Sequence, residues 1–530
     1  MQFSRLSTPS PGTTGAKRYR ATSVALGALC TLLFLTFLDN TVVAVALGKL
    51  QTDLHASVAD LQWVVGAYAL TFASIMLACG MIGDELGRKK VMLTGAGVFC
   101  AGSVLCALAP NAQVLIAGRA IMGLGAAASE PGTLSVLRHI YDDGRARARA
   151  IGVWAAVSGL ALALGPVIGG ALIGVWSWRG IFWFNLAFGL AALLVAAVVV
   201  PESADPRAGR VDTAGTLLGA GALATLIFGI IDAETSGFGA AVPVTLFCVA
   251  AVLAVTFAWW EHRAANPLVD PRFFRLLPFT VPNVVAFCTY FATFAIFFFT
   301  ALYFVEVFSD SGYKIALIFA PMTVLMIAAS VFTGYWTGRA GPRWPITIGC
   351  LLFGAGLLLT NPLISEHPDY PLLAITLALA GIGIGITVVP VTSTVLDAVP
   401  PERSGMAASS ANTSREIGAV TGVAILGALV FSLVNSNLTT HLQQLNLPAS
   451  QKAQFIQYKA LIIQFIETGQ VTGVTASNYN TQSGPYAKVV GAAYAAFGDG
   501  VHAALYLSAG LMLLAGLLAA VTLRGTRGRS

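Results

Sequence analysis

Long apolar segments alternate with short polar segments along nearly all of the 530 residues. A helix needs about 20 consecutive, mostly apolar residues to cross a bilayer. Windows of about 19 residues predict fourteen membrane-spanning helices. They are 21–47, 61–81, 91–109, 114–137, 148–175, 178–200, 213–231, 243–260, 280–305, 315–337, 346–364, 372–395, 406–433 and 501–523. The pattern therefore predicts an all-α polytopic membrane protein.

Composition and charge agree with this prediction and suggest an orientation. The chain is 56% hydrophobic and 10% charged, and its mean hydropathy is +0.78, which lies outside the range of soluble globular proteins. Of the 30 Lys and Arg residues, 22 fall in the two tails and in the loops on the same side. This bias predicts that both termini are cytoplasmic. The net charge of +6 follows from it, so we predict no nucleic-acid partner.

Several classes of chemistry are not supported by the sequence. The seven cysteines all fall in predicted spans, and no CxxC or CxxH spacing occurs, so disulfides and zinc are disfavoured. No Gly-x-x-x-x-Gly-Lys-Ser/Thr loop is present. None of the six histidines pairs with a Ser or Cys motif. We therefore predict a protein that is not an enzyme, uses no metal or cofactor, and draws any work from an ion gradient or a separate partner.

The chain contains signs of an internal duplication. Gly334–Arg343 repeats the glycine spacing of Gly80–Lys90, and Gly381–Gly385 before Pro390 resembles Gly123–Gly125 before Pro131. The two offsets, 254 and 259 residues, are close to each other. Two six-helix halves with two extra spans between them fit this spacing.

This reading divides the chain into segments with distinct roles. They are a cytoplasmic N-tail (1–20), a first six-helix bundle (21–200), two linker spans (201–279), a second bundle (280–523) with a polar external insert (434–500), and a cytoplasmic C-tail (524–530). Within the insert, Ala453–Ile466 has apolar residues at broadly helical spacing. The insert is either an interfacial amphipathic helix or cap, or a disordered segment.

Two charges are predicted at similar depth inside the first bundle. Asp39 lies about 12 Å and Arg119 about 7 Å from the external surface, at 1.5 Å per residue. Each charge at bilayer depth costs a few kcal/mol and needs a partner or a function. Burial disfavours the charged form of a carboxyl and a nearby cation favours it, so this pair could load and release a proton. The alternative is a static ion pair that joins two helices.

Glu130 is the most unusual residue, and Pro131 after it predicts a kink. It lies roughly 16 Å further towards the cytoplasm than Arg119 on the same helix. Glu130 is either a second protonatable site or contact for a cationic substrate, or a gate acid partnered by Arg88 or another cytoplasmic cation.

Arg415 and Glu416 form a possible charge network in the thirteenth span. As neighbours on a helix they point about 100° apart, so each should meet a different helix. Both are placed near the cytoplasmic end of the span, where snorkelling to the surface would also explain them.

Two glycine-rich segments complete the candidate residues. The first, Gly80–Lys90, joins two spans as a cytoplasmic gate, with the candidates Gly80, Asp84, Gly87, Arg88 and Lys89. We expect Asp84 to cap a neighbouring helix and Arg88 to seek an acid on the fourth span. The second is a bent, closely packed stretch of the fifth span formed by Gly165, Pro166, Gly169 and Gly170.

These motifs, in this order, resemble the fourteen-span drug:proton antiporters of the major facilitator superfamily. They are Leu38-Asp39-x-Thr41, Gly80-x-x-x-Asp84, Arg119-x-x-x-Gly123, Gly165-Pro166-x-x-Gly169-Gly170 and Trp178-Arg179-x-x-Phe182-x-x-Asn185. In that family the second glycine segment is the antiporter motif, whose bent helix is thought to seal the path against leakage. Four positions depart from the family pattern: Gly48 replaces a proline, Glu85 an arginine, Ala161 a glycine, and Glu130 an apolar residue.

The resemblance implies alternating access and export of small hydrophobic or cationic compounds in exchange for protons. We expect a monomer in the bacterial cytoplasmic membrane, with membrane lipid, protons and a small substrate as its partners. One alternative is a dedicated exporter of one lipid or secondary metabolite. The other is a membrane sensor or assembly subunit that transports nothing, which is disfavoured because sensors rarely need protonatable residues in several spans.

Overall fold

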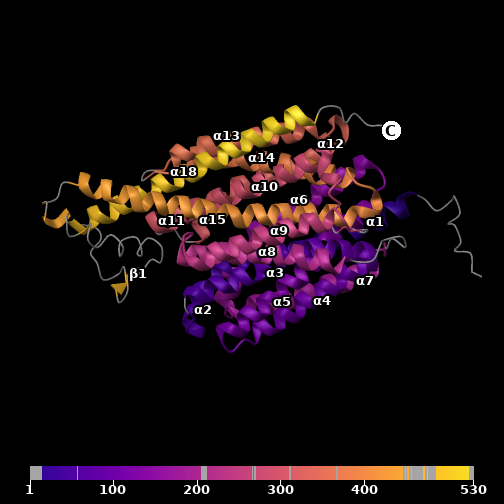
Figure 1. The fold of residues 1–530 in the computed structure, drawn as a ribbon, viewed down its shortest axis with the longest axis horizontal. Coiled ribbons are helices and arrows are strands. Elements are labelled where there is room, and N and C mark those ends of the chain that lie inside the picture. Colours follow the sequence, from indigo (N-terminus) through magenta and orange to yellow (C-terminus); the bar gives the residue numbers. More distant parts are fainter. Residues whose placement is uncertain are drawn as a thin grey trace, which may run out of the picture.

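The protein is an elongated bundle of helices that run mostly along one direction (Figure 1). The computed structural model describes residues 15–56, 58–203, 212–264, 267, 270–308, 312–365, 368–445, 448, 450–452, 455, 470–471, 474–475 and 485–523. The start of α1 and the end of α18 lie at one end of the bundle, here called the terminal end (Figure 1). The opposite end carries β1 and α2 and is called the hairpin end.

The helices before the linker form the first half of the molecule. They are α1 (Gly15–Val42), the 3-10 turn η1 (Ala44–Ala46), α2 (Leu47–Leu54), α3 (Val58–Leu86), α4 (Arg88–Ala107), α5 (Ala112–Ile140), α6 (Gly144–Val175) and α7 (Arg179–Val199). Two further helices, α8 (Thr213–Ser236) and α9 (Ala241–Glu261), pack against each other, and α8 also contacts α3 and α15.

The second half contains the remaining elements. They are η2 (Phe273–Arg275), α10 (Leu277–Phe294), the π-helical turn η3 (Ala295–Phe299), α11 (Thr300–Phe308), α12 (Gly312–Ala340), α13 (Arg343–Thr360), η4 (Asn361–Leu363), α14 (Tyr370–Asp397), η5 (Pro401–Arg403), α15 (Ser404–Gln444), the short antiparallel strands β1 (Gln470–Val471) and β2 (Val474–Thr475), and α18 (Pro485–Thr522).

The prediction of an all-α polytopic membrane protein is confirmed. Within the described residues, 13 helices are long and apolar enough to cross a membrane, and α10, η3 and α11 form one of them. The helix α6 is not among these 13, but it has 32 residues and packs between α1 and α12. A count of fourteen spans therefore stays a prediction that depends on α6.

Several helix boundaries differ from the predicted ones, and three of these differences affect the packing. The first helix ends at Val42 instead of 47, where Thr41, Val42 and Val43 place three β-branched residues in a row, and such residues restrict side-chain freedom in a helix. At the other end of the chain, α15 continues to Gln444 and α18 begins at Pro485.

The extension of α15 has an apolar stripe that explains its length. Val434, Leu438 and Leu442 recur every four residues and are at most 1% exposed, so they fall on one helix face. They pack in the same core as residues of α18, which lies beside α15 (Figure 1). Most of the predicted amphipathic helix at 453–466 lies outside the described residues.

The two halves repeat one packing arrangement, as the proposed duplication predicts. A Cβ added to Gly95 on α4 would lie 2.6 Å from the carbonyl oxygen of Gly125 on α5. A Cβ added to Gly349 on α13 would lie 3.0 Å from the carbonyl oxygen of Gly383 on α14. Both distances are below ordinary van der Waals contact, so each pair allows two helices to approach closely.

The halves also approach each other closely towards the terminal end. A Cβ on Gly152 of α6 would lie 2.7 Å from the carbonyl oxygen of Ser330 on α12. A Cβ on Gly334 of α12 would lie 2.7 Å from the carbonyl oxygen of Ala148 on α6. At these two positions there is no room for a side chain between the helices.

Candidate functional site

Asp39 and Arg119 form an ion pair inside the first half. Arg119 NH1 donates to Asp39 Oδ2, and both side chains are almost completely buried. The pair joins α1 to α5, as their similar predicted depths suggested. A buried ion pair is stable only when the remaining polar atoms also find partners.

The other atoms of this pair are satisfied by two further helices. Asn185 Nδ2 on α7 donates to Asp39 Oδ1 at 2.7 Å, and Arg119 Nε donates to the carbonyl oxygen of Val64 on α3 at 3.0 Å. The Arg119 guanidinium carbon also lies 4.4 Å from the centroid of the Tyr68 ring. Four helices therefore meet at one neutral, hydrogen-bonded centre.

Asn185 was part of a recognised motif, but its contact with Asp39 was not predicted. It is fully buried, and its nearest neighbours along α7 are apolar. A buried polar group needs a hydrogen-bond partner, so an amide inside such an apolar segment could have predicted a partner on another helix. The sequence gives no indication of which partner it finds.

The glycine segment of α6 packs directly beside this centre. A Cβ on Gly165 would collide with Thr41, and a Cβ on Gly169 would lie 3.0 Å from the carbonyl oxygen of Val42. Gly170 has no atom within 4 Å of its Cβ position. The side chain of Pro166 lies outside the described residues. Two of the four candidate residues thus hold α6 against the part of α1 that follows Asp39.

A second charged centre lies where the two halves meet. Arg415 on α15 donates from NH1 to Asn412 Oδ1 at 2.9 Å and from NH2 to Thr392 Oγ1 on α14. Its guanidinium carbon lies 5.4 Å from the ring of Trp154 on α6 and 5.6 Å from the ring of Tyr290 on α10. These separations are within the range of cation–π attraction.

The snorkelling explanation for Arg415 was wrong. The residue is 2% exposed, and its partners are two side chains and two aromatic rings. Arg415 lies eleven positions into α15, or roughly 16 Å along the helix axis, so its side chain is held inside the bundle.

Glu130 approaches the same centre from the first half. It is 3% exposed and lies within electrostatic range of Glu416 and Arg415. Thr133 Oγ1 donates to the carbonyl oxygen of Glu130 at 2.7 Å, and Trp154 Nε1 donates to that hydroxyl at 3.0 Å. Trp154 therefore touches the turn of α5 that carries Glu130 and the cation on α15.

One of the two predicted roles of Glu130 was a gate acid partnered by Arg88 or another cytoplasmic cation. Arg88 instead donates from Nε to Asp84 at 2.9 Å and from NH2 to the carbonyl oxygens of Pro401 and Glu402 at 3.0 and 3.3 Å. The expectation that Arg88 seeks an acid on the fourth span was therefore wrong. The reason is that the sharp turn at Gly87, between α3 and α4, places Arg88 beside Asp84 at the end of α3.

Asp84 caps a helix of the opposite half. The backbone N–H groups of Gly405 and Met406 donate to its Oδ1 and Oδ2 at 2.9 and 3.1 Å. They belong to the first turn of α15, whose own N-cap residue supplies no side-chain bond. A carboxylate at a helix N-terminus satisfies free N–H groups and complements the helix dipole. We call Asp84, Arg88 and the backbone of 401–406 the terminal latch.

The other gate candidates surround this latch. A Cβ on Gly80 would collide with the carbonyl oxygen of Gly405. Gly87 has a φ of 109°, which side chains with a Cβ rarely adopt. The Lys89 ammonium donates to the carbonyl oxygen of Ala197 at 2.6 Å. The two glycines thus allow close contact and a sharp turn at the same end of α3.

Two further bonds between the halves were not predicted from any sequence pattern. Arg138 NH2 on α5 donates to the carbonyl oxygen of Val399 at 2.7 Å, and Arg147 NH2 on α6 pairs with Asp397 Oδ1 at 2.5 Å. These contacts join residues about 250 positions apart, so no local pattern could have indicated them.

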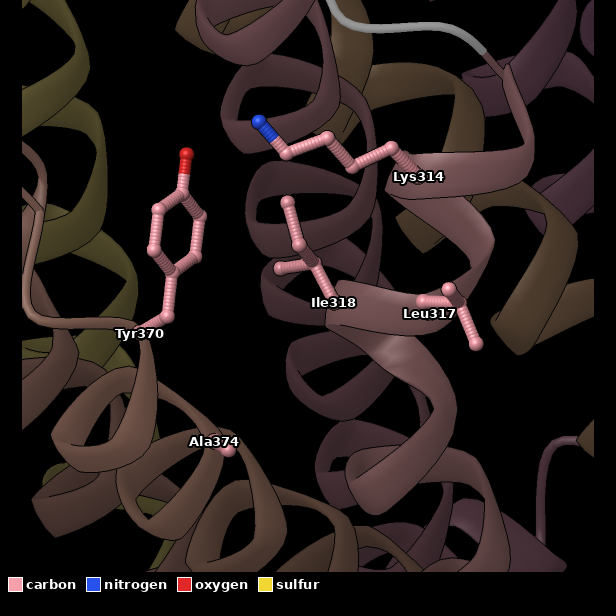
Figure 2. A pocket seen from close by; sticks show the side chains of 5 residues that line it. All are labelled: Lys314, Leu317, Ile318, Tyr370 and Ala374. Carbon is pink, nitrogen blue, oxygen red and sulfur yellow. The ribbon is translucent and has the colours of Figure 1, made fainter.

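The surface hollow between α12 and α14 is separate from the charged centres and from the terminal latch. Among the residues that the structure describes, no group of three or more His, Cys, Asp or Glu could hold a metal ion. A hollow between α12 and α14 is lined by Lys314, Leu317, Ile318, Tyr370 and Ala374 (Figure 2). Its volume is about 240 Å³. None of these residues belongs to the charged centres or to the terminal latch.

Two pseudo-equivalent helical halves, closely joined at one end, with buried ionisable groups between and within them, define a secondary membrane transporter. The sequence profile of the Major Facilitator Superfamily matches residues 29–423. The chain belongs to this superfamily, which confirms the resemblance inferred from its motifs.

Curated relatives and a solved structure agree with this assignment. The chain is 32% identical over 412 residues to the multidrug resistance protein Stp of Mycobacterium tuberculosis, covering 78% of this chain and 76% of Stp. It is 34% identical over 418 residues to a methylenomycin A resistance protein of Streptomyces coelicolor, covering 79% and 88%. The human organic anion transporter MFSD10 has the same fold, with a TM-score of 0.61, 16% identity, and coverage of 95% and 99%.

Proposed function

We propose that the protein is a proton-coupled antiporter that exports small hydrophobic or cationic compounds by alternating access. The observation that carries this proposal is the set of ionisable side chains at the meeting of the two halves, the buried Glu130 and Arg415 and the half-buried Glu416. Charges inside a membrane protein are costly and mark ion or substrate pathways. Relatives over about three quarters of the chain are named multidrug and antibiotic resistance proteins.

The proton-coupling groups are Asp39, Arg119 and Glu130. All three are buried, and they lie on α1 and α5, which pack against each other. The phenol of Tyr68 lies within electrostatic range of all three and of Glu416.

The terminal latch is one of the two gates of the transport cycle. Its bonds join the end of α3 and the start of α4 to η5 and the start of α15, so they must break when the halves separate at the terminal end. The bias of cations towards this side supports a cytoplasmic position for both termini. The conformation described here then corresponds to closure towards the cytoplasm of a bacterial inner membrane protein that acts as a monomer.

The glycine segment of α6 keeps the other path closed to ions. Gly165 and Gly169 press α6 onto Thr41 and Val42, just beyond Asp39. Larger residues here would separate the helices and admit water next to the ion pair. The expected result of Gly165→Leu is proton leakage without substrate.

A second candidate is a dedicated exporter of one compound. The observation that favours it is the 34% identity to a protein named for resistance to methylenomycin A alone. Under this alternative the chain would use the same proton coupling and gates but would accept one lipid or secondary metabolite.

Transport by the purified protein in vesicles tests both candidates. A panel of ethidium, tetraphenylphosphonium and neutral hydrophobic antibiotics is offered with an imposed proton gradient. We expect accumulation of several compounds that stops when an uncoupler is added. Accumulation of a single compound would favour the dedicated exporter, and accumulation that ignores the uncoupler would contradict proton coupling.

A further inference from the structure

The hollow between α12 and α14 has polar atoms at one end and apolar side chains below them (Figure 2). We propose that it binds one phospholipid with a net negative charge, whose headgroup phosphate meets Lys314 and Tyr370 and whose acyl chain follows α12. The proposal depends on the membrane fold, and it is independent of what the protein transports and of how transport is coupled.

The hollow lies at the level where lipid headgroups meet the hydrocarbon layer. Lys314 is the third residue of α12, and Tyr370 is the first residue of α14. Both helices run towards the terminal end, where Gly334 of α12 packs against α6 and Asp397 of α14 pairs with Arg147, so both begin at the hairpin end. Lysine and tyrosine at the ends of spanning helices place their polar tips among the headgroups and their apolar parts in the hydrocarbon.

The polar end of the hollow suits a phosphodiester. The Lys314 ammonium lies 5.1 Å from the centroid of the Tyr370 ring, within the range of cation–π attraction. The Tyr370 hydroxyl points to the same end of the hollow as this ammonium (Figure 2), so N–H and O–H donors stand side by side. Asp369 accepts from the backbone N–H of Leu372 at 3.1 Å and thus caps its own helix. Basic pockets between membrane helices bind anionic headgroups.

The apolar end of the hollow continues into an exposed face of α12. Leu317, Val324 and Val331 recur every seven residues and are 55%, 60% and 38% exposed, so they fall on one helix face. The apolar span of α12 begins at Leu317. In a membrane such a face contacts lipid, and an acyl chain that starts at Leu317 can follow α12 into the hydrocarbon layer.

The size of the hollow favours a lipid over a transported compound. Its volume of about 240 Å³ is below the roughly 300–1,000 Å³ of pockets that enclose a drug-sized molecule. A hollow of this size, open at the exposed Leu317, suits one end of a longer molecule whose remaining part lies in the bilayer. The positive charge of Lys314 also disfavours the hydrophobic cations proposed as substrates.

The single cation at the polar end predicts selectivity for the charge of the headgroup. In phosphatidylethanolamine the phosphate is balanced by the ammonium of the lipid itself, so Lys314 adds little attraction. In phosphatidylglycerol the phosphate has no such internal partner. The site should therefore prefer phosphatidylglycerol, and the preference should depend on Lys314.

Photo-crosslinking of the purified full-length protein in vesicles tests the proposal. The probe is phosphatidylglycerol with a diazirine near the carboxyl end of one acyl chain, and a phosphatidylethanolamine probe with the same chains is the comparison. We expect the first probe to label residues 314–324 and 370–375 about fivefold more than the second, the effect of one basic residue at an anionic membrane surface. K314Q should remove this preference. Y370F keeps the ring but loses the hydroxyl, and should lower the labelling about twofold, as for one weak hydrogen bond.

A matched variant separates a specific site from general attraction to surface charge. K49Q removes a lysine from a second hollow at the hairpin end. That hollow has a volume of about 430 Å³ and is lined by Val45, Lys49, Thr52, Gly170 and Ile173. K49Q should leave the labelling of α12 and α14 as in the wild type. An equal loss in K49Q and K314Q, or equal labelling of the wild type by both probes, would overturn the proposal.

Two further measurements address misfolding and the source of the phosphate. The unfolding temperature of K314Q in detergent without lipid should equal that of the wild type, and phosphatidylglycerol should raise it only in the wild type, because a ligand stabilises the state that binds it. Inorganic phosphate should not reduce the labelling. Loss of labelling with inorganic phosphate alone would assign the hollow to a free anion and overturn the lipid site. A protein that exports nothing in the vesicle assay would overturn the proposed function and leave this result intact.

Discussion

The Asp39 centre and the Arg415 centre differ in the balance of their charges, and this difference separates a structural role from a functional one. At Asp39 each charge has an opposite partner, and Asn185, Val64 and Tyr68 complete the contacts. At Arg415 one cation faces two carboxyl groups, and it bonds to neutral groups instead. Asp39, Arg119, Glu130 and Arg415 are at most 3% exposed, whereas Glu416 is partly exposed. The balance of charges and the access to Glu416 together distinguish the centre that is free to change its occupancy.

Arg119→Leu should produce the largest loss of stability. The substitution leaves the fully buried Asp39 without its cation, and removing one partner of a buried pair costs about 3–5 kcal/mol. Thermal unfolding of the purified protein in detergent measures the effect. The double variant D39N/R119L should recover part of the loss. An unchanged unfolding temperature for R119L would show that the Asp39 centre is not the closed unit described above.

Asp84→Asn should have the next largest effect, because it weakens the hydrogen bonds and the ion pair that the Asp84 carboxylate forms in the terminal latch. The carboxylate accepts two backbone N–H groups of α15 and one Arg88 N–H. Hydrogen bonds to charged groups contribute about 1.5–3 kcal/mol each, and asparagine keeps part of them. The distance between labels at the terminal ends of α6 and α12 should increase in pulsed electron paramagnetic resonance. Glu85→Gln, on the same turn, is the matched control.

Trp154→Phe should have a smaller effect, confined to the Arg415 centre. Phenylalanine keeps an aromatic face for the guanidinium but loses the bond from Nε1 to Thr133. The net contribution of such a hydrogen bond is about 1 kcal/mol. Unfolding in detergent should show this loss, and Trp183→Phe on the exposed face of α7 serves as the comparison. A loss as large as that of R119L would mean that Trp154 supports the whole fold.

Glu416→Gln should leave stability within about 1 kcal/mol of the wild type or raise it. Neutralising the half-buried Glu416 removes its repulsion with Glu130 and leaves no charge without a partner. Proton-driven ethidium export should nevertheless fall at least tenfold. Vesicle transport and thermal unfolding on the same preparation decide the matter. A marked fall in stability would place Glu416 in a neutral pair like that of Asp39 and break the comparison.

The sequence was sufficient for the membrane fold and the family because both depend on local patterns. Apolar segments long enough to cross the bilayer mark the helices, and short motifs such as Gly80-x-x-x-Asp84 mark the superfamily. The depths of Asp39 and Arg119 also followed from counting residues along their helices.

The partners of the charged groups could not be obtained in this way. Arg88 was assigned to an acid on the fourth span because the sequence does not show that the turn at Gly87 brings the start of α4 back to Asp84 at the end of α3. Arg415 was placed near a surface because the sequence does not show how far the other helices extend around it. The bonds from Asp84 to Gly405 and from Arg147 to Asp397 join the two halves, so they depend on packing that no local pattern specifies.

The length of α15 has a mechanical consequence. Its 41 residues extend over about 60 Å, about twice the thickness of the hydrocarbon layer. The terminal latch holds one end, Arg415 lies about a quarter of the way along, and α18 accompanies the far part through the bonds of Asp499 to Asn437 and His441. A rotation of only ~10° about the latch would displace the far end by ~10 Å for a rod of this length. A small rotation of α15 near the charged centre would therefore produce a large displacement of its far end, outside the bundle.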